Sequence, residues 1–363
     1  MRLYSNGKLL ISGEYVILDG ALSLAVPSVF GQYLEILEDD SKYINWTSKN
    51  SNGKVWFDCK ICIESLELKE SSSNKVSNKL IQIIKTIREL NPDFLNNCGS
   101  KITTRLTFDK NWGLGTSSTL ISNLSKLARI DPFQLNNRIF NGSGYDIACA
   151  ESNSPLLYRI SKNEKYIEEV SFKPVFHENI YFVYLNTKQN SLTEVKKYKK
   201  LKISNSLLTE ISDITNKLLN CSNQKNFNDL IYSHEQIISK LISKKTIKKE
   251  LFSDFNGEIK SLGAWGGDFI LATGNQKNWN YFRKKGLWNP RLAFAQFGGL
   301  DVLDEATSRV DEPKPRLVDL VLMSALSPDY RGKQYNKMKL QKLSNIVDVC
   351  PIFAKLSTLH CNI

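Results

Sequence analysis

The chain has 363 residues, of which 41% are hydrophobic and 24% charged, and its formal net charge at pH 7 is +12. This length exceeds one minimal domain, and the composition excludes a disordered chain and indicates a sizeable core. The longest apolar stretch, residues 9–30, is interrupted by Glu14 and Asp19, so it is not a membrane span. We find no secretory signal. We therefore expect a soluble, cytoplasmic protein without a membrane partner.

The first third of the sequence predicts mainly strands. Short apolar or alternating runs mark them at residues 9–11, 22–26, 33–37, 55–63 and 102–108. A serine- and lysine-rich stretch, residues 69–77, predicts a loop. Residues 80–90 have helical spacing that ends before Pro92.

The second half predicts a strand at residues 181–185, a long helical region at 192–251 and a strand at 269–271. A short helix is expected to end at Gly286. The composition then changes, because five of the ten prolines follow residue 286. We expect an appended or frame-shifted tail, poorly packed on the body. The alternative is a small subdomain that closes the second sheet through residues 292–297.

Cysteines and basic runs give weaker indications. Seven cysteines without regular spacing favour a reducing compartment. Cys59 and Cys62 lie in a predicted strand that points them to opposite faces, and no second pair completes a zinc site. Two lysine-rich runs, residues 196–202 and 244–249, alternate with apolar residues as solvated helix faces do. Attraction of anionic substrates is the first alternative, and nucleic-acid binding is disfavoured because no aromatic ladder accompanies the lysines.

The most informative segment is residues 111–119, which follow a predicted strand and open a predicted helix. Gly113 and Gly115 would let the backbone approach an anion, and amides at the helix start would point at it. The hydroxyls of Thr116 and Ser117 could reach a phosphate oxygen or a magnesium ion. A helix cap would explain the same pattern. No Gly-Lys-Ser/Thr ends the segment, so it is not a Walker loop.

Residues 113–118, GLGTSS, resemble the GLGSSA phosphate loop of the GHMP kinases. Three further segments agree in the family's order. Residues 6–15, NGKLLISGEY, resemble the first motif, PGKLxxxGEY; residues 143–148, SGYDIA, are similar to the segment with the catalytic aspartate; and residues 262–268, LGAWGGD, are similar to the third motif, SGAGGGD. These segments look most like phosphomevalonate and mevalonate kinases, and SGYDIA also resembles the bacterial GYDIA-type GHMP kinases.

The resemblance implies the two-domain α+β GHMP kinase fold. An S5-like N-terminal ATP-binding domain would occupy residues 1–165 and a ferredoxin-like α+β C-terminal domain residues 170–286, with the site between them and residues 287–363 as a tail. It implies ATP and Mg²⁺ as cofactors. The expected reaction is phosphorylation of a small anionic metabolite, mevalonate 5-phosphate or mevalonate, by a monomer or homodimer without a nucleic-acid partner. The alternatives are a non-catalytic nucleotide-binding homologue and a sibling of diphosphomevalonate decarboxylase.

The same resemblance assigns site residues. Asp146 matches the catalytic aspartate, and Lys8 matches the lysine that keeps it ionised. The nucleotide would contact Gly113, Leu114, Gly115, Thr116, Ser117 and Ser118. Magnesium would be bound by Thr116, Ser117 and Glu14. The substrate would contact Lys188, Ser191, Gly263, Gly266, Gly267 and Asp268.

Some positions depart from the family's pattern. Asn6 replaces the proline of the first motif, and Asp109 and Asn111 replace a proline and a glycine before the phosphate loop. Ser118 stands where alanine is usual. Trp265 stands where glycine is usual, and its side chain is expected to crowd ligands. These departures predict altered specificity, or a protein that binds ATP without transferring phosphate. No role is expected for the three histidines, His177, His234 and His360.

Overall fold

The computed structural model describes residues 1–161, 164–187 and 191–287. Contacts join these described residues into one compact unit. The tail predicted from residue 287 onward lies outside the described residues apart from Leu287 itself, so both readings of the tail stay predictions. The structure confirms the predicted mixed α+β class, with one large and one small sheet.

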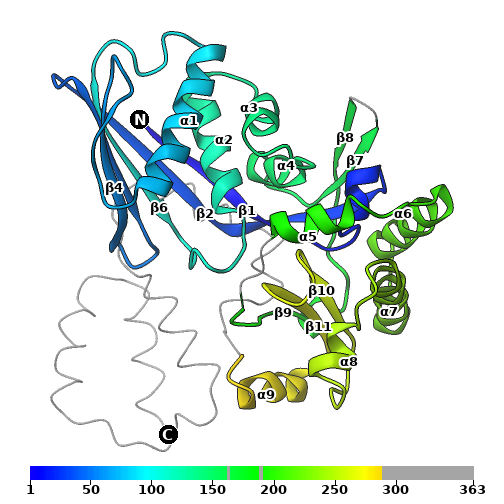
Figure 1. The fold of residues 1–363 in the computed structure, drawn as a ribbon. Coiled ribbons are helices and arrows are strands. Elements are labelled where there is room, and N and C mark those ends of the chain that lie inside the picture. The colour runs from blue at the N-terminus through cyan, green and yellow to red at the C-terminus, as the bar shows by residue number, and fades with distance from the viewer. Residues whose placement is uncertain (162–163, 188–190, 288–363) are drawn as a thin grey trace, which may run out of the picture. The chain divides into compact units, whose positions relative to one another are not determined.

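An eight-stranded sheet forms the first half of the fold (Figure 1). Its strands are β1 (Arg2–Leu10), β2 (Ser23–Asp39), β3 (Tyr43–Lys49), β4 (Val55–Cys62), β5 (Leu68–Ser71), β6 (Gly99–Leu106), β7 (Leu156–Ser161) and β8 (Glu164–Glu169). The order is β5-β4-β3-β6-β2-β7-β8, with β1 added on β2. Because β2 is 17 residues long, it pairs with β1 along one edge and with both β6 and β7 along the other. The β3–β6 pair is parallel.

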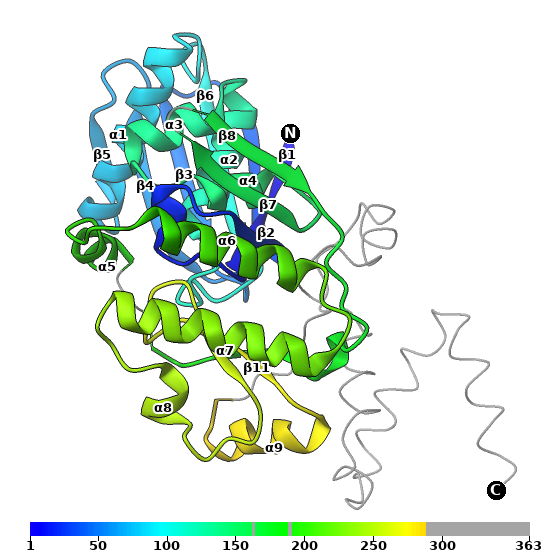
Figure 2. The same ribbon diagram turned by 90° about the vertical axis from the view of Figure 1, so that its right-hand side faces the viewer.

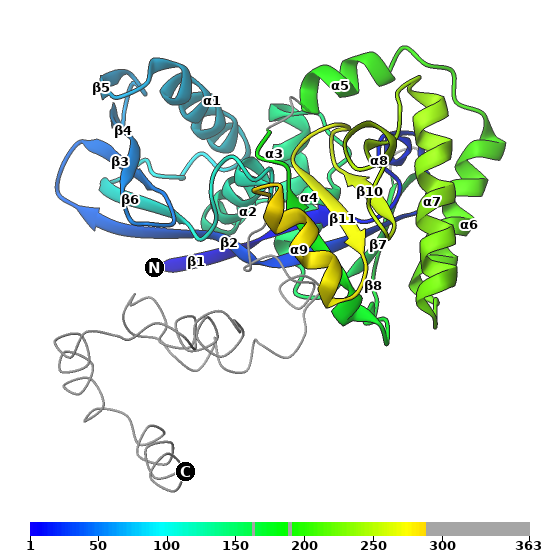
Figure 3. The same ribbon diagram turned by 90° about the horizontal axis from the view of Figure 1, so that it is seen from below.

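Four helices cover this sheet on one face (Figures 1 and 3). They are α1 (Asn74–Leu90), α2 (Thr116–Ala128), α3 (Pro132–Ile139) and α4 (Tyr145–Glu151). The apolar stripe of α1, including Ile84 and Ile87, packs with Trp46 and Phe57 of the sheet. The loop expected at residues 69–77 was wrong in part, because β5 and the first turn of α1 lie within it. The predicted end of this helix before Pro92 is confirmed.

A three-stranded antiparallel sheet organises the second half. Its strands are β9 (Ile180–Tyr184), β10 (Ile259–Leu262) and β11 (Phe269–Thr273), in the order β10-β11-β9. The β11 side chains alternate between two cores: Phe269 and Leu271 belong to the cluster that includes the large sheet, whereas Ile270 and Ala272 pack with Ile247 and Phe282. Such a strand, buried on both faces, reads in sequence as a continuous apolar run.

Five helices belong to the second half of the fold. They are α5 (Ser191–Tyr198), α6 (Asn205–Leu219), α7 (Gln224–Leu241), α8 (Ile247–Leu251) and α9 (Gln276–Lys284). Among them, α7 and α8 contact β10 of the small sheet. The long helical region expected at residues 192–251 is thus four helices, of which α6 and α7 lie side by side (Figure 2). Ser204, Asn223 and Thr246 cap three of them with side-chain oxygens. Among the described helices, none has the length and apolar character to cross a membrane.

One hydrophobic cluster connects the two sheets. Leu9, Leu24 and Leu106 of the large sheet pack in the same cluster as Phe182 and Leu271 of the small sheet. This shared core fixes the positions of the ends of β1 and β6 relative to β10 and β11. The glycine-rich segments follow these strand ends. The domain boundary expected at residues 165–170 stays a prediction.

Candidate active site

The segment at residues 113–115 forms a tight turn between β6 and α2. Gly113 and Gly115 have φ angles of +69° and +94°, a backbone region that glycine enters without strain. Leu114 between them is fully buried in the core, and its carbonyl accepts a 3.0 Å hydrogen bond from the Lys8 amide. Leu114 therefore anchors the turn to β1. Helix α2 begins immediately afterwards at Thr116.

Lys8 lies beside this turn. A Cβ placed on Gly115 would come within 3.3 Å of Lys8 Cγ, so the lysine stem passes directly over the glycine. Its Nζ lies 5.4 Å from the centre of the Tyr145 ring. Burial alone would lower the pKa of Lys8, but Tyr145, Asp146 and Asp268 together outweigh burial and raise it. The ammonium group is therefore charged at neutral pH.

Asp146 is the second residue of α4 and is half-buried near Lys8. Burial raises the pKa of its carboxyl group, while the Lys8 charge and the Ile147 amide oppose that shift. The Ile147 amide donates to Asp146 Oδ1 at 3.2 Å. A carboxylate with a raised pKa, beside a fixed cation, is suited to accept a proton from a reacting hydroxyl.

Asp268 enters the same site from the loop between β10 and β11. Its side chain is 9% exposed, and its amide donates to the Thr187 carbonyl at 2.7 Å. A Cβ placed on Gly113 would come within 2.8 Å of its Cγ, and its charge helps to raise the pKa of Lys8. The structure thus brings together residues from all four sequence motifs.

The hydroxyl groups at the start of α2 differ in their surroundings. Ser118 is buried and donates to the Gly115 carbonyl at 2.9 Å, so its hydroxyl stabilises the turn. Thr116 is half-buried and Ser117 is exposed, both in the first turn of α2. The first amides of a helix have no partner within it, and they attract anions together with the helix dipole. Thr116 and Ser117 are therefore placed to contact a bound anion or its counter-ion.

The other residues predicted for the substrate are only partly described. Gly263 and Gly266 have positive φ angles of +73° and +88° in the 263–268 loop, and Gly267 is buried. Lys188 lies outside the described residues. Ser191 is the first residue of α5. The contacts predicted for Lys188 and Ser191 stay predictions.

Glu14 does not join this group. It is 2% exposed, and its Oε1 forms an ion pair with Lys260 Nζ at 2.5 Å. Its Oε2 lies 3.4 Å from Nε2 of the buried His234. The carboxylate is neutralised inside the fold, which argues against its predicted role as a magnesium ligand. Sequence reasoning also missed His234, which accepts a 3.0 Å hydrogen bond from the Gly13 amide.

Trp265 does not crowd the glycine loop, contrary to the sequence-based expectation. Its side chain is 2% exposed and packs in a cluster with Tyr15, Tyr198 and Ile211. The indole Nε1 donates to the Lys245 carbonyl at 2.9 Å. The large side chain therefore fixes the loop to the surrounding helices.

The donor set fits magnesium carried by a nucleotide better than a magnesium cage built by the protein. Among the described residues, no group of three His, Cys, Asp or Glu side chains could hold a metal ion. Magnesium commonly uses one or two protein ligands together with phosphate oxygens and water. The hydroxyls of Thr116 and Ser117, next to the turn at Gly113 and Gly115, match that arrangement.

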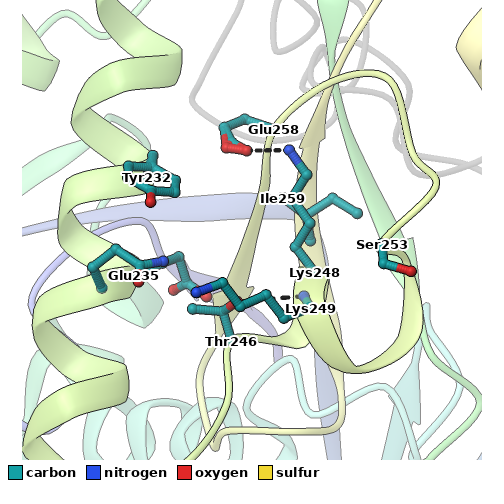
Figure 4. A pocket seen from close by; sticks show the side chains of 9 residues that line it. Tyr232, Glu235, Thr246, Lys248, Lys249, Ser253, Glu258 and Ile259 are labelled. Atoms are coloured by element: carbon teal, nitrogen blue, oxygen red, sulfur yellow. Dashed lines mark hydrogen bonds and ion pairs between the residues drawn. The ribbon is translucent and has the colours of Figure 1, made fainter.

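A separate pocket of about 180 Å³ lies between α7, α8 and β10 (Figure 4). Its wall carries an ion pair between Lys248 and Glu258, and Glu235 also contributes to its lining. None of the residues predicted for the active site lines this pocket. It is therefore distinct from the group formed by Lys8, Asp146 and Asp268.

The sequence matches no family model and no curated relative. Solved structures, however, share its fold. Mevalonate kinase from Methanococcus jannaschii superposes with a TM-score of 0.60 at 16% identity, over 78% of this chain and 94% of that one. Phosphomevalonate kinase from Streptococcus pneumoniae, in complex with phosphomevalonate and AMPPNP, gives 0.60 at 17% identity over 78% and 95%.

Galactokinase from Lactococcus lactis, complexed with galactose, gives a TM-score of 0.56 at 14% identity over 85% of this chain and 90% of that one. The three enzymes act on different acceptors, so the likeness identifies the scaffold and leaves the substrate open. The chain has the fold of the GHMP kinases.

Proposed function

We propose that this protein is an ATP-dependent small-molecule kinase that phosphorylates a small anionic metabolite. One observation carries the proposal: Lys8, Asp146 and Asp268 meet beside the turn at Gly113 and Gly115. Phosphoryl transfer requires mainly positioning of the reactants and neutralisation of charge. A fixed cation, a carboxylate and a helix start whose first amides would bind an anion supply both.

The nucleotide phosphates would lie against the glycine turn, where no side chain blocks the backbone, and at the amides that begin α2. The hydroxyls of Thr116 and Ser117 would contact the magnesium ion bound with the nucleotide. When bound, that ion would neutralise charge on the phosphate oxygens. The AMPPNP bound to the pneumococcal enzyme of the same fold supports ATP as the phosphoryl donor.

Asp146 would orient the acceptor hydroxyl and take its proton as the new O–P bond forms and the bond from the γ-phosphorus to the bridging oxygen of ATP breaks, with ADP as the leaving group. Lys8 would hold Asp146 in its ionised form and stabilise the negative charge that develops on the transferred group. An acceptor phosphate is already ionised at neutral pH, and for such an acceptor Lys8 would contribute more than Asp146. The relative loss of kcat on substitution of Lys8 and of Asp146 can therefore distinguish a hydroxyl acceptor from a phosphate acceptor.

Mevalonate 5-phosphate and mevalonate are the acceptors we propose. Their support is the likeness of the Gly-Glu-Tyr, Asp-Ile-Ala and Gly-Gly-Asp segments to those kinases, together with two mevalonate-pathway enzymes among the structures that share this fold. The net charge of +12 would also raise the local concentration of an anionic acceptor.

A coupled ADP-release screen tests this proposal. The panel is mevalonate, mevalonate 5-phosphate, homoserine and galactose, each with ATP and Mg²⁺ and with an acceptor-free control. We expect the highest kcat/KM with mevalonate 5-phosphate or mevalonate. Stoichiometric ATP binding without acceptor-dependent ADP release would instead identify a non-catalytic nucleotide-binding protein. Carbon dioxide release from diphosphomevalonate would identify a decarboxylase.

A further inference from the structure

A buried charge cluster lies outside the group of residues that would contact substrates. Lys260 on β10 has no exposed surface, and its Nζ contacts Glu14 Oε1 at 2.5 Å and Glu235 Oε1 at 3.9 Å. It also donates to the Ser261 carbonyl at 3.0 Å. The cluster joins three separate parts of the chain: the segment after β1, helix α7 and strand β10.

His234 on α7 belongs to this cluster as a neutral group. Its Nε2 accepts the hydrogen bond from the Gly13 amide, so the ring proton must be on Nδ1. Burial, reinforced by the Lys260 charge, lowers the pKa of His234 well below its ordinary value. The 3.4 Å approach of Nε2 to Glu14 is consequently not an ion pair. His234 instead holds the backbone next to Glu14.

A second link runs parallel to the ion pair. The Trp265 amide donates to the Tyr15 hydroxyl at 2.9 Å, and both side chains are buried in one cluster with Tyr198. Tyr15 follows Glu14 directly, and Trp265 lies in the middle of the 263–268 loop. The segment at residues 13–15 is thus joined to β10 by one contact and to the 263–268 loop by the other.

Each joined segment leads to a residue of the candidate active site. Residues 13–15 continue from β1, which carries Lys8, and the 263–268 loop ends at Asp268. The backbone of Asp268 is itself fixed, because its amide donates to Thr187 and its carbonyl accepts from Leu185 at 2.9 Å. A buried ion pair contributes little net stability compared with apolar packing. We therefore expect this ion pair to act mainly by fixing the positions of the segments that it joins.

We propose that Glu14, Tyr15, His234 and Lys260 are positioning residues that hold Asp268 against Gly113 and Lys8 for phosphoryl transfer. We call these four side chains the clamp. The inference rests on the proposed kinase function and deepens it. The clamp residues act through the backbone segments that they join, whereas Lys8, Asp146 and Asp268 act on the reactants.

Three variants loosen the clamp without leaving an unpaired buried charge. Tyr15→Phe keeps the ring and removes the acceptor of the Trp265 amide. The double variant Glu14→Gln/Lys260→Met removes both charges together. Tyr232→Phe, on the exposed part of α7, is the matched control for removal of a hydroxyl. His234→Gln, which keeps an acceptor for the Gly13 amide, is compared with His234→Leu, which does not.

Hydrogen exchange and steady-state kinetics of the full chain provide the two readouts. For Tyr15→Phe, Glu14→Gln/Lys260→Met and His234→Leu, we expect faster exchange of the amides at residues 263–268 and unchanged exchange in α1. We also expect kcat to fall about tenfold while the Kd for ATP changes by less than about twofold, since only alignment is lost. Tyr232→Phe should match the wild-type protein, and His234→Gln should lie close to it.

Unchanged exchange at residues 263–268 in the three loosened variants would overturn the clamp, and so would faster exchange with wild-type kcat. Uniformly faster exchange across α1 and the loop would mean that these residues only stabilise the fold. If the wild-type protein turns over no acceptor, the proposed function fails by itself. The exchange measurement would still decide whether the clamp holds the 263–268 loop.

Discussion

The carboxylate of Asp268 packs directly on the backbone of Gly113: a Cβ placed there would meet its Cγ at 2.8 Å and its oxygens at 2.9 and 3.0 Å. The contact joins the turn before α2 to the loop after β10, although 155 residues separate them in the sequence. It exists because residue 113 has no side chain. A glycine there is required both for its positive φ angle and for this approach.

Gly113→Ala should therefore lower kcat by about tenfold or more, because the new methyl group displaces Asp268 from its position near Lys8. Gly53→Ala is the matched control: Gly53 has a φ angle of +79°, but no atom lies within 4 Å of its Cβ position. Both substitutions should cost about 1–2 kcal/mol of stability from backbone strain. An equal kcat in the two variants would show that the Asp268–Gly113 contact does not affect turnover.

Asp146→Asn should leave ATP affinity nearly intact, because the amide keeps the shape of the carboxylate. With a hydroxyl acceptor, kcat should fall by about 10²-fold or more, the usual scale for loss of a positioned base. With a phosphate acceptor the loss should be smaller. Isothermal calorimetry for ATP and steady-state kinetics with each acceptor provide the measurements. Near-wild-type turnover of a hydroxyl acceptor would remove Asp146 from the catalytic role.

Glu235 should make the stability of the protein depend on pH. Burial, only partly offset by Lys260, raises the pKa of its carboxyl group from 4.5 to about 8. The folded state thus retains a proton that the unfolded state has lost between these values. The contribution of Glu235 to stability is therefore fully present below pH 4.5, and it is lost as the pH rises through about 8.

Glu235→Gln should remove this dependence. The melting temperature of the variant, relative to the wild-type protein, should rise between about pH 5 and about pH 8.5. Glu250→Gln on the exposed surface of α8 is the control, and its difference from wild type should not follow this trend. Parallel melting curves for wild type and Glu235→Gln across this range would contradict the shifted pKa of Glu235.

Trp265 should contribute to stability through packing. Trp265→Ala should lower the free energy of unfolding by about 3–5 kcal/mol, as expected for removal of a buried large side chain. Trp265→Phe keeps most of the ring packing but loses the hydrogen bond to the Lys245 carbonyl, and it should cost about 1–2 kcal/mol. Denaturant titration measures both. A stable Trp265→Ala variant would mean that the indole does not support the 263–268 loop.

Local patterns in the sequence predicted much of this arrangement. The glycine segment at residues 113–115, the start of α2 and the end of α1 before Pro92 depend on neighbouring residues, so they can be predicted from short segments. The start of α1 was missed because burial of Ser77 and Leu80 extends the helix through a polar stretch. Packing against the sheet outweighed local composition there.

The buried cluster could not be predicted in the same way. Lys260 and Glu14 are 246 residues apart, and each alone looks like an ordinary charged residue at a strand or turn. One signal was present: Lys260 lies between Ile259 and Leu262 in β10, a strand in which all four residues are buried. A charged residue at such a position requires a buried partner. The identity of that partner depends on the tertiary fold, and so does the identity of the group that pairs with His234.

The most direct test of the central claim is acceptor-dependent ADP formation by the wild-type protein and by Lys8→Met, with ATP affinity measured in parallel. Lys8 should matter for hydroxyl and phosphate acceptors alike, because its charge stabilises the transferred group in both cases. We predict that mevalonate or mevalonate 5-phosphate stimulates ADP release, and that Lys8→Met lowers kcat by about 10²-fold or more. ATP binding without acceptor-stimulated release, or wild-type kcat in Lys8→Met, would contradict the assignment of this site as a kinase centre.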